Sequence, residues 1–376
     1  MLYLDHAAGG PVRPEVLDAM APFLLGRYGN PSSVHTVGED VSAALEDARR
    51  RIAAVLGMRA GDVVFTSGGT EANNLAIAGI ALGARGRRPG HVITTAIEHS
   101  SVLAVCRYLE RMHDYDLDIL PVDAHGRVRP ADIAAAVRVD TAVISIGYAN
   151  NEIGTVQDLA AVAAAAGGIP LHVDAVQAAG WLPLSGTGAA ALSIAGHKLG
   201  APQGIGALAV RGRLPLEPLL HGGGQERGRR AGTQNVAGAV GLAVALELAE
   251  HERADAASRA TAARRAFTDR VLATIPGSRL TGDAVDRLPG LASFVFVGTS
   301  GEAVLLELER RGIVTSSGSA CSAGSTDASH VLTAIGLNED EARTAVRFSF
   351  DRSEPPTPAV LADALGAAVA AVRSAA

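Results

Sequence analysis

The sequence predicts an α/β protein with a mostly parallel central sheet and a second, smaller α+β domain. Between about residue 60 and residue 215, short runs rich in β-branched residues alternate with alanine-rich stretches of helical period. These runs occupy residues 63–65, 91–95, 142–145 and 171–174. Such alternation is typical of βα units whose parallel strands are buried on both faces. Ligands bind beyond the carboxyl ends of such strands, so the residues that follow each run are the first candidates for a site.

The character of the chain changes along a long helical stretch, from about residue 234 to residue 275. Beyond it come Gly and Pro turns, a strand-like run and two further helical patterns. A chain of 376 residues is long enough for one large and one smaller domain. We expect a large α/β domain over residues 12–255, and a small α+β domain formed by residues 1–11 and 256–376.

Composition restricts the classes of partner. A hydrophobic content of 48% with 19% charged residues is typical of a globular chain, and a net charge of −6 offers no basic face to nucleic acid or to an anionic membrane. The longest nearly uncharged apolar run, 237–246, is short of the roughly 20 residues that span a bilayer. The N-terminus does not have the pattern of a secretory signal. We expect a cytoplasmic protein whose partners are small molecules or other proteins.

A phosphate site is predicted where the first run of the sheet ends. Residues 67–74, with the sequence SGGTEANN, should follow a strand and open a helix. The unpaired N–H groups and the positive dipole of a helix start attract phosphate, and Thr70 adds a hydroxyl. An ordinary strand-to-helix turn is the alternative, and the missing lysine excludes a Walker loop.

Two more residues are suited to the chemistry of pyridoxal phosphate (PLP). Asp174 ends a predicted strand, where a carboxylate can hold a pyridine nitrogen protonated; capping the next turn is the alternative. Lys198 follows His197 in a segment poor in other charges. Desolvation of such an amine favours the neutral form that imine chemistry needs, although a solvated loop lysine is the commoner case. The phosphate turn, the acid and the lysine together favour a PLP site.

The two cysteines are too few for a disulfide framework, and each should be a free thiol. Cys106 shares helical spacing with Val102 and Leu109, which indicates a core position. Cys321 lies among small residues in the run 316–325, which should be exposed and mobile. Cys321 is therefore the thiol expected to react.

The sequence resembles the class V, fold type I PLP-dependent enzymes, and within them the cysteine desulfurases. The matching stretches cover nearly the whole chain in order. They are 3–8, 29–33, 67–74, 98–99, 150–154, 172–177, 196–198, 222–226, 232–233, 316–321 and 346–349.

The resemblance implies a role for each catalytic residue. Lys198 would hold the cofactor covalently and move the α-proton of the substrate. His99 would stack on the pyridine ring and serve in acid–base steps, and Asp174 would pair with the ring nitrogen. Asn151 and Gln177 would contact the ring hydroxyl or the substrate.

The resemblance also implies how phosphate and substrate are held. Gly69, Thr70 and His197 would hold the phosphate. Thr233 would reach the phosphate of a neighbouring subunit, which implies a homodimer. Arg347 would bind the substrate carboxylate, a task suited to its bidentate fork.

The activity implied is removal of sulfur from L-cysteine, which gives L-alanine and a persulfide on Cys321. An acceptor protein would then take the sulfur for iron–sulfur cluster assembly or for thiolation of tRNA or a cofactor. A related carbon–sulfur lyase or selenocysteine lyase is one alternative, and an inactive scaffold that binds an acceptor protein is another.

Two positions depart from the pattern of the family. Ala195 stands where a phosphate-binding Ser or Thr is common, so we expect either fewer phosphate contacts or contacts supplied differently, by Ser193 or backbone amides. Gly9 and Gly10 stand where Thr-Thr is common, which puts packing near the entrance in doubt.

Overall fold

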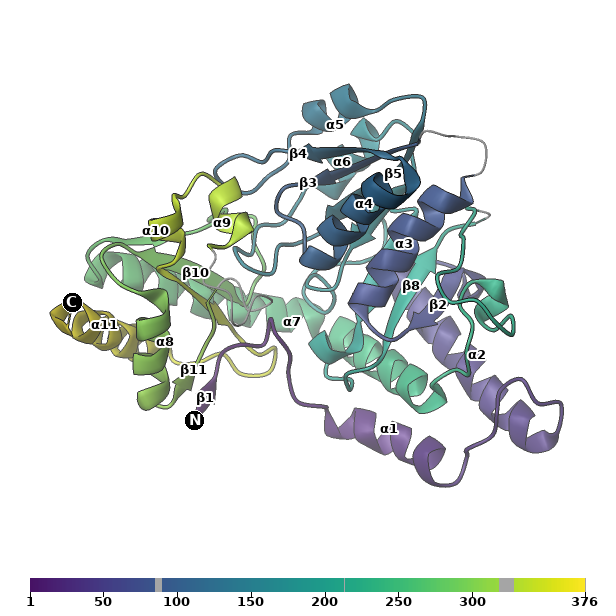
Figure 1. Ribbon diagram of the computed structural model, residues 1–376. Helices are drawn as coiled ribbons and strands as arrows, with labels where there is room; N and C mark the ends of the chain where they lie inside the picture. The colour runs from purple at the N-terminus through teal and green to yellow at the C-terminus, as the bar shows by residue number, and fades with distance from the viewer. Residues whose placement is uncertain (85–89, 213, 318–327, 376) are drawn as a thin grey trace.

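The computed structural model describes residues 1–84, 90–212, 214–317 and 328–375. The chain has the predicted α/β fold (Figure 1). Its main sheet has seven strands in the order β2-β8-β7-β6-β5-β3-β4. Of these strands, only β8 runs opposite to the others, so the expectation of a mostly parallel sheet is confirmed. The strands are β2 (Val63–Thr66), β3 (His91–Thr95), β4 (Asp116–Leu120), β5 (Thr141–Gly147), β6 (Leu171–Asp174), β7 (Ala191–Ala195) and β8 (Gly206–Val210).

Helices cover both faces of this sheet, which explains why its strands are apolar throughout. One face packs against α3 (Gly69–Gly83) and α4 (Ser100–His113). The other face packs against a larger set: α1 (Pro14–Leu25), α2 (Thr36–Leu56), α5 (Pro130–Ala136), α6 (Leu159–Ala165) and α7 (Val236–Thr274). Short 3-10 helices are η1 (Ala60–Asp62), η2 (Gly196–Lys198) and η3 (Glu226–Gly228).

A second, smaller sheet lies beside the first. It is antiparallel, in the order β12-β10-β9, and β1 pairs in parallel with β11 next to it. Edge-to-face contacts of Phe267 with Phe294 and Phe348 fill its core. Its elements are β1 (Leu2–Tyr3), β9 (Ser278–Leu280), β10 (Leu291–Phe296), α8 (Gly301–Arg310), β11 (Ile313–Val314), α9 (His330–Ala334), α10 (Glu339–Ala342), β12 (Ala345–Ser349) and α11 (Pro358–Ala375).

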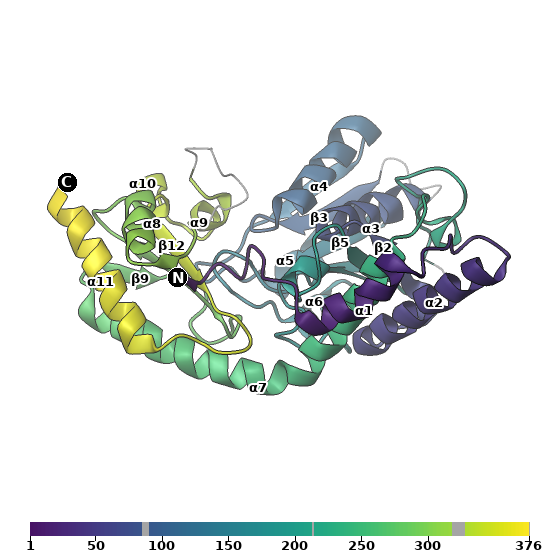
Figure 2. The same ribbon diagram turned by 90° about the horizontal axis from the view of Figure 1, so that it is seen from below.

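Helix α7 belongs to the cores of both sheets. Its first half packs on the large sheet through Leu242 and Leu246, and its second half contributes Phe267 and Val271 to the small one. Figure 2 shows this helix running beneath both parts of the molecule. The expected domain limit at residue 255 falls inside this continuous helix and stays a prediction.

Helix α11 is long and apolar enough to cross a membrane by length and composition. Its side chains Leu361, Leu365 and Val369 are buried in the core of the small sheet. This packing accounts for its apolar face without a membrane.

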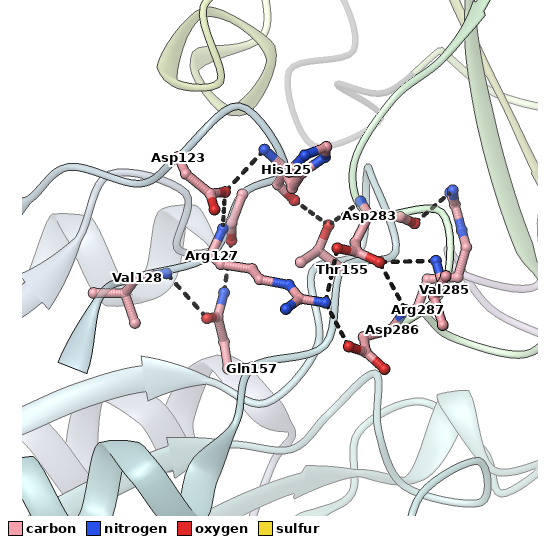
Figure 3. Close-up of polar contacts among 11 residues, drawn as sticks. Asp123, His125, Arg127, Val128, Thr155, Gln157, Asp283, Val285, Asp286 and Arg287 are labelled. Carbon is pink, nitrogen blue, oxygen red and sulfur yellow. Dashed lines mark hydrogen bonds and ion pairs between the residues drawn. The ribbon is translucent and has the colours of Figure 1, made fainter.

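Buried polar contacts join the two parts (Figure 3). The guanidinium of Arg287 donates to the carbonyls of Ile153, Asp283 and Leu291 at 2.8, 3.0 and 3.1 Å. Burial lowers the pKa of Arg287 to about 9. Nearer the surface, Arg127 pairs with the Asp283 carboxylate at 2.8 Å. Arg287 thus ties the loop before β10 to the turn that contains Ile153.

We expect Arg287→Met to lower the free energy of unfolding by about 3 kcal/mol, because it leaves buried carbonyls without donors. Arg127→Met removes a half-exposed ion pair and should cost about 1 kcal/mol or less. Urea titration of both cofactor-loaded variants checks this difference. Equal losses of unfolding free energy in the two variants would show that the hydrogen bonds from Arg287 to the three carbonyls do not stabilise the contact between the two parts.

Candidate active site

A cavity of about 490 Å³ lies at the carboxyl ends of the large sheet. It brings together most of the site residues predicted from the sequence, which come from loops after several strands and from the small sheet. Those that line it are Gly69, Thr70, His99, Asn151, Asp174, Gln177, His197, Lys198 and Arg347.

The start of α3 forms one end of the cavity. No side chain among the described residues caps this helix, so its first N–H groups are available to an anion. Gly69 is required here, because a Cβ atom would lie 2.7 Å from the Val176 side chain and 3.4 Å from Ala195 Cβ. Ala195 itself is buried and lines the cavity. These features fit a phosphate group held by backbone amides.

Ser193 does not compensate for Ala195, and this expectation is wrong. Its hydroxyl is buried and lies 2.9 Å from His172 Nε2. Ser193 stands two residues before the end of β7, about 7 Å back along the strand. The backbone amides of α3 are the alternative that the geometry retains.

Asp174, the last residue of β6, is held by two donors. Its Oδ1 accepts from the backbone N–H of Val176 at 3.0 Å, and its Oδ2 accepts from Asn73 Nδ2 at 2.6 Å. Burial raises the pKa of Asp174, and these hydrogen bonds and the charges of His99 and Lys198 oppose that rise. A protonated pyridine nitrogen would be a suitable further partner for this carboxylate.

Lys198 ends the short helix η2, directly after β7. Its Nζ donates to the carbonyl oxygen of Ala7, which also accepts from Gln177 Nε2 at 2.9 Å. Burial, aided by the charge of Lys198, lowers the pKa of His197 to about 4 and keeps that imidazole neutral. The N-terminal segment that contains Ala7 therefore lies against the lysine amine in the wall of the cavity.

His99 is the N-cap of α4, and its Nδ1 accepts from the backbone N–H of Ser101 at 3.1 Å. The preceding residue, Glu98, is buried beneath it and bonds to Thr95 Oγ1 at 2.5 Å and to the Gly147 N–H at 2.7 Å. Burial raises the pKa of Glu98 to about 8. Burial therefore favours the neutral form of Glu98, and the hydrogen bonds from Thr95 and Gly147 oppose this effect.

Arg347 enters the cavity from β12 of the small sheet. Its Nη2 donates to Asp5 Oδ1 at 2.6 Å, and its Nη1 donates to the Asn151 carbonyl at 3.0 Å. Its Nε is buried without a partner among the described residues. A substrate carboxylate would therefore meet a guanidinium whose position is already fixed by Asp5 and Asn151.

Thr233 and Cys321 are not brought into this cavity by the described chain. Thr233 is exposed and lies outside it, and Cys321 lies outside the described residues. The expectation for Cys106 is confirmed: it is buried in α4, and burial raises its pKa to about 12. A thiol with that pKa is a poor nucleophile near neutral pH.

The described residues on either side of the Cys321 segment are fixed at the wall of the site. Before it, Ser316 pairs with Arg347 through their backbones. After it, Ser329 Oγ donates to Glu152 Oε2 at 2.5 Å, and His330 Nε2 lies 3.0 Å from the Glu98 carbonyl. Both ends of this segment therefore start from residues next to the cavity.

Sequence reasoning gave no individual role to Asn73, Ser101, Glu98 or Glu152, although Asn73, Glu98 and Glu152 lie within the matching stretches. Asn73 lies one helical turn after Gly69, and Glu98 directly precedes His99, so spacing offered a signal for these two. Ser101 follows His99 by two residues in the same helix start, whereas the contact of Glu152 with Ser329 joins distant segments, and spacing offered no signal for it.

Comparison with known proteins agrees with this geometry. The sequence model of the aminotransferase class-V family matches residues 2–355. The chain belongs to this family. Among curated relatives, cysteine desulfurase IscS of Dictyoglomus turgidum is 43% identical over 352 residues, which are 93% of this chain and 89% of the relative. A cysteine desulfurase of Gluconacetobacter diazotrophicus is 44% identical, with 93% and 88% covered.

Solved structures share this fold. A NifS-like protein superposes with a TM-score of 0.87 at 32% identity, over 100% of this chain and 98% of that one. A structure described as SspA in complex with cysteine gives a TM-score of 0.80 at 35% identity, over 93% and 98%. This class-V enzyme uses PLP, and the uncapped start of α3, the buried Asp174 and the lysine fit that cofactor.

Glu152, the buried acid that contacts Ser329, should make the stability of this class-V enzyme depend on pH. Burial raises the pKa of Glu152 to about 7 from its ordinary value of 4.5, while the Ser329 hydrogen bond and the charges of Arg347 and His99 oppose the rise. Because the folded state holds this proton more tightly than the unfolded state, stability is lost as the pH rises through this range.

Glu152→Gln carries no such proton and keeps an acceptor for Ser329. We compare the free energy of unfolding of this variant with that of the natural protein at two pH values. The difference in favour of the variant should be on the order of 2 kcal/mol larger at about pH 8 than at about pH 5. Urea titration at both pH values checks this, with Glu302→Gln, at an exposed position, as control. The same gain at both pH values would contradict the expected burial of a protonated Glu152.

Proposed function

We propose that this enzyme is a cysteine desulfurase that takes sulfur from L-cysteine, releases L-alanine and carries the sulfur as a persulfide on Cys321. The observation that carries the proposal is the meeting of Lys198, Asp174 and Arg347 in one cavity, since PLP chemistry on an amino acid needs an amine, an acid and a carboxylate clamp. The named relatives and the structure described with cysteine support this substrate.

Each residue of the cavity has a role in this proposal. Lys198 holds the cofactor covalently and later moves the α-proton of the substrate. Asp174 pairs with the ring nitrogen, and Asn151 and Gln177 contact the ring hydroxyl or the substrate. When bound, the cofactor withdraws electrons from the substrate carbon next to the amine. Gly69, Thr70 and His197 hold its phosphate, and Arg347 holds the substrate carboxylate.

In this proposal, Cys321 receives the sulfur atom of the substrate. Its thiolate attacks the sulfur of the substrate, so an S–S bond forms while the C–S bond breaks. The electron pair of the broken bond stays on the substrate carbon, which takes up a proton and leaves as alanine. Ser316 pairs with Arg347, and His330 contacts Glu98; both partners line the cavity, which supports a role for the segment between Ser316 and His330.

We also propose a cytoplasmic homodimer that passes sulfur to an acceptor protein of iron–sulfur cluster assembly or of tRNA or cofactor thiolation. In a dimer, Thr233 of one subunit would reach the phosphate of the other. Its exposure in the single chain is consistent with this role. Large apolar side chains exposed on and after α1 would also be covered by a second copy; they are Leu24, Leu25, Tyr28 and Val34.

Loss of the Cys321 thiol tests the proposal against a carbon–sulfur lyase or selenocysteine lyase. We expect Cys321→Ser to lower alanine formation from cysteine by more than about 100-fold, because the second cysteine is buried and unreactive. The cofactor absorbance should be unchanged, and Cys106→Ser is the matched control. Retained turnover in Cys321→Ser would favour a lyase.

Intact mass analysis after incubation with cysteine provides a second readout. The natural enzyme should gain the mass of a sulfur atom on the peptide that contains Cys321. A chain that never converts cysteine, although it is loaded with PLP, would instead support an inactive scaffold that binds an acceptor protein.

A further inference from the structure

An acidic side chain lies at the end of the cavity where the cofactor phosphate is proposed to bind. Glu71 belongs to the first turn of α3 and lines the cavity. Its Oε2 accepts from the backbone N–H of Ser67 at 2.7 Å. The carboxylate therefore shares the positive start of this helix with any anion that binds there. An unpaired Glu71 would repel a phosphate group.

Arg230 supplies the opposite charge. Its Nε donates to Glu71 Oε1 at 2.9 Å, and its Nη2 donates to Oε2 at 3.4 Å. The two side chains are only 21% and 15% exposed, so solvent screens this pair less than a surface ion pair. Burial raises the pKa of Glu71, but the hydrogen bonds from Arg230 and Ser67 outweigh that effect and lower the pKa below its ordinary value. Glu71 is thus held as a carboxylate within a pair of no net charge.

The segment that carries Arg230 is anchored independently of this pair. Four residues earlier, Glu226 is buried, and its carboxylate accepts from Arg49 at 2.7 and 3.0 Å. The same carboxylate accepts from the backbone N–H of Phe65 at 2.9 Å. The residue after Arg230, Ala231, is buried as well. Loss of the Arg230 charge should therefore leave the segment in place.

We propose that Arg230 is a positioning residue for cofactor binding, which neutralises Glu71 so that the start of α3 accepts a phosphate group. Arg230 acts through Glu71: the paired carboxylate still holds the Ser67 N–H, yet it adds no net negative charge. The inference rests on the part of the proposed function that places the phosphate at Gly69 and Thr70.

Binding of PLP and of pyridoxal, which lacks the phosphate, tests this role. The cofactor is removed from the full-length enzyme, and each compound is titrated back while its absorbance is followed. We expect Arg230→Gln to weaken PLP binding by on the order of 10-fold, because an unpaired carboxylate then lies at the phosphate end. Pyridoxal binding should stay within about 2-fold of the natural enzyme, since pyridoxal brings no charge to that end.

Glu71→Gln, alone and combined with Arg230→Gln, separates the charge from an anchoring role. Gln keeps an acceptor for the Ser67 N–H, so Glu71→Gln should bind PLP at least as tightly as the natural enzyme. The double variant should recover PLP binding to within about 3-fold of the natural enzyme, a recovery that a lost anchor would not allow. Arg227→Gln is the matched control, because Arg227 lies on the same segment and pairs with Glu46 outside the cavity.

Thermal unfolding checks that each variant is folded. Equal loss of PLP and pyridoxal binding in Arg230→Gln, or unchanged PLP binding, would overturn the inference, as would a double variant as weak as Arg230→Gln. Weaker PLP binding by Glu71→Gln would also overturn it, and this result does not depend on the folding of Arg230→Gln. A natural enzyme that binds pyridoxal as tightly as PLP would instead contradict the proposed phosphate site, and the inference with it.

Discussion

The arrangement of this site depends on one buried carboxylate, that of Asp174. A carboxylate in an apolar interior must be paired or hydrogen-bonded, or it takes up a proton. Here the Val176 N–H and the Asn73 amide supply two donors, and the charges of His99 and Lys198 favour the ionised form. An ionised acid in this place is what holds a pyridine nitrogen protonated. The neighbouring residues therefore oppose the effect of burial on Asp174 and favour its ionised form.

The small sheet contributes Arg347 to a site whose other residues lie mostly at the large sheet. Arg347 comes from β12, yet its guanidinium is oriented by Asp5 and by the Asn151 carbonyl. Arg287 binds the same turn through the Ile153 carbonyl. Because both arginines hold the turn that contains Asn151, the position of one sheet relative to the other sets the geometry of the substrate clamp.

Sequence reasoning predicted the parts of the site that obey local rules. Strand ends and a helix start led to Asp174, Gly69 and Thr70, and the structure places these residues in one cavity. Helical spacing gave the buried position of Cys106. These predictions succeeded because the period of apolar residues and the position of a strand end are encoded within short segments.

The remaining features depend on contacts between distant segments. The pairs Asn73 with Asp174 and Glu152 with Ser329 join residues 101 and 177 positions apart. The expectation for Ser193 failed because the depth of a residue along its strand cannot be read from motif spacing. The most direct test of the central claim is borohydride reduction of the purified yellow enzyme followed by peptide mapping. The account predicts a pyridoxyl group on Lys198, lost in Lys198→Ala; a colourless protein after soaking with PLP, or a label on another lysine, would contradict it.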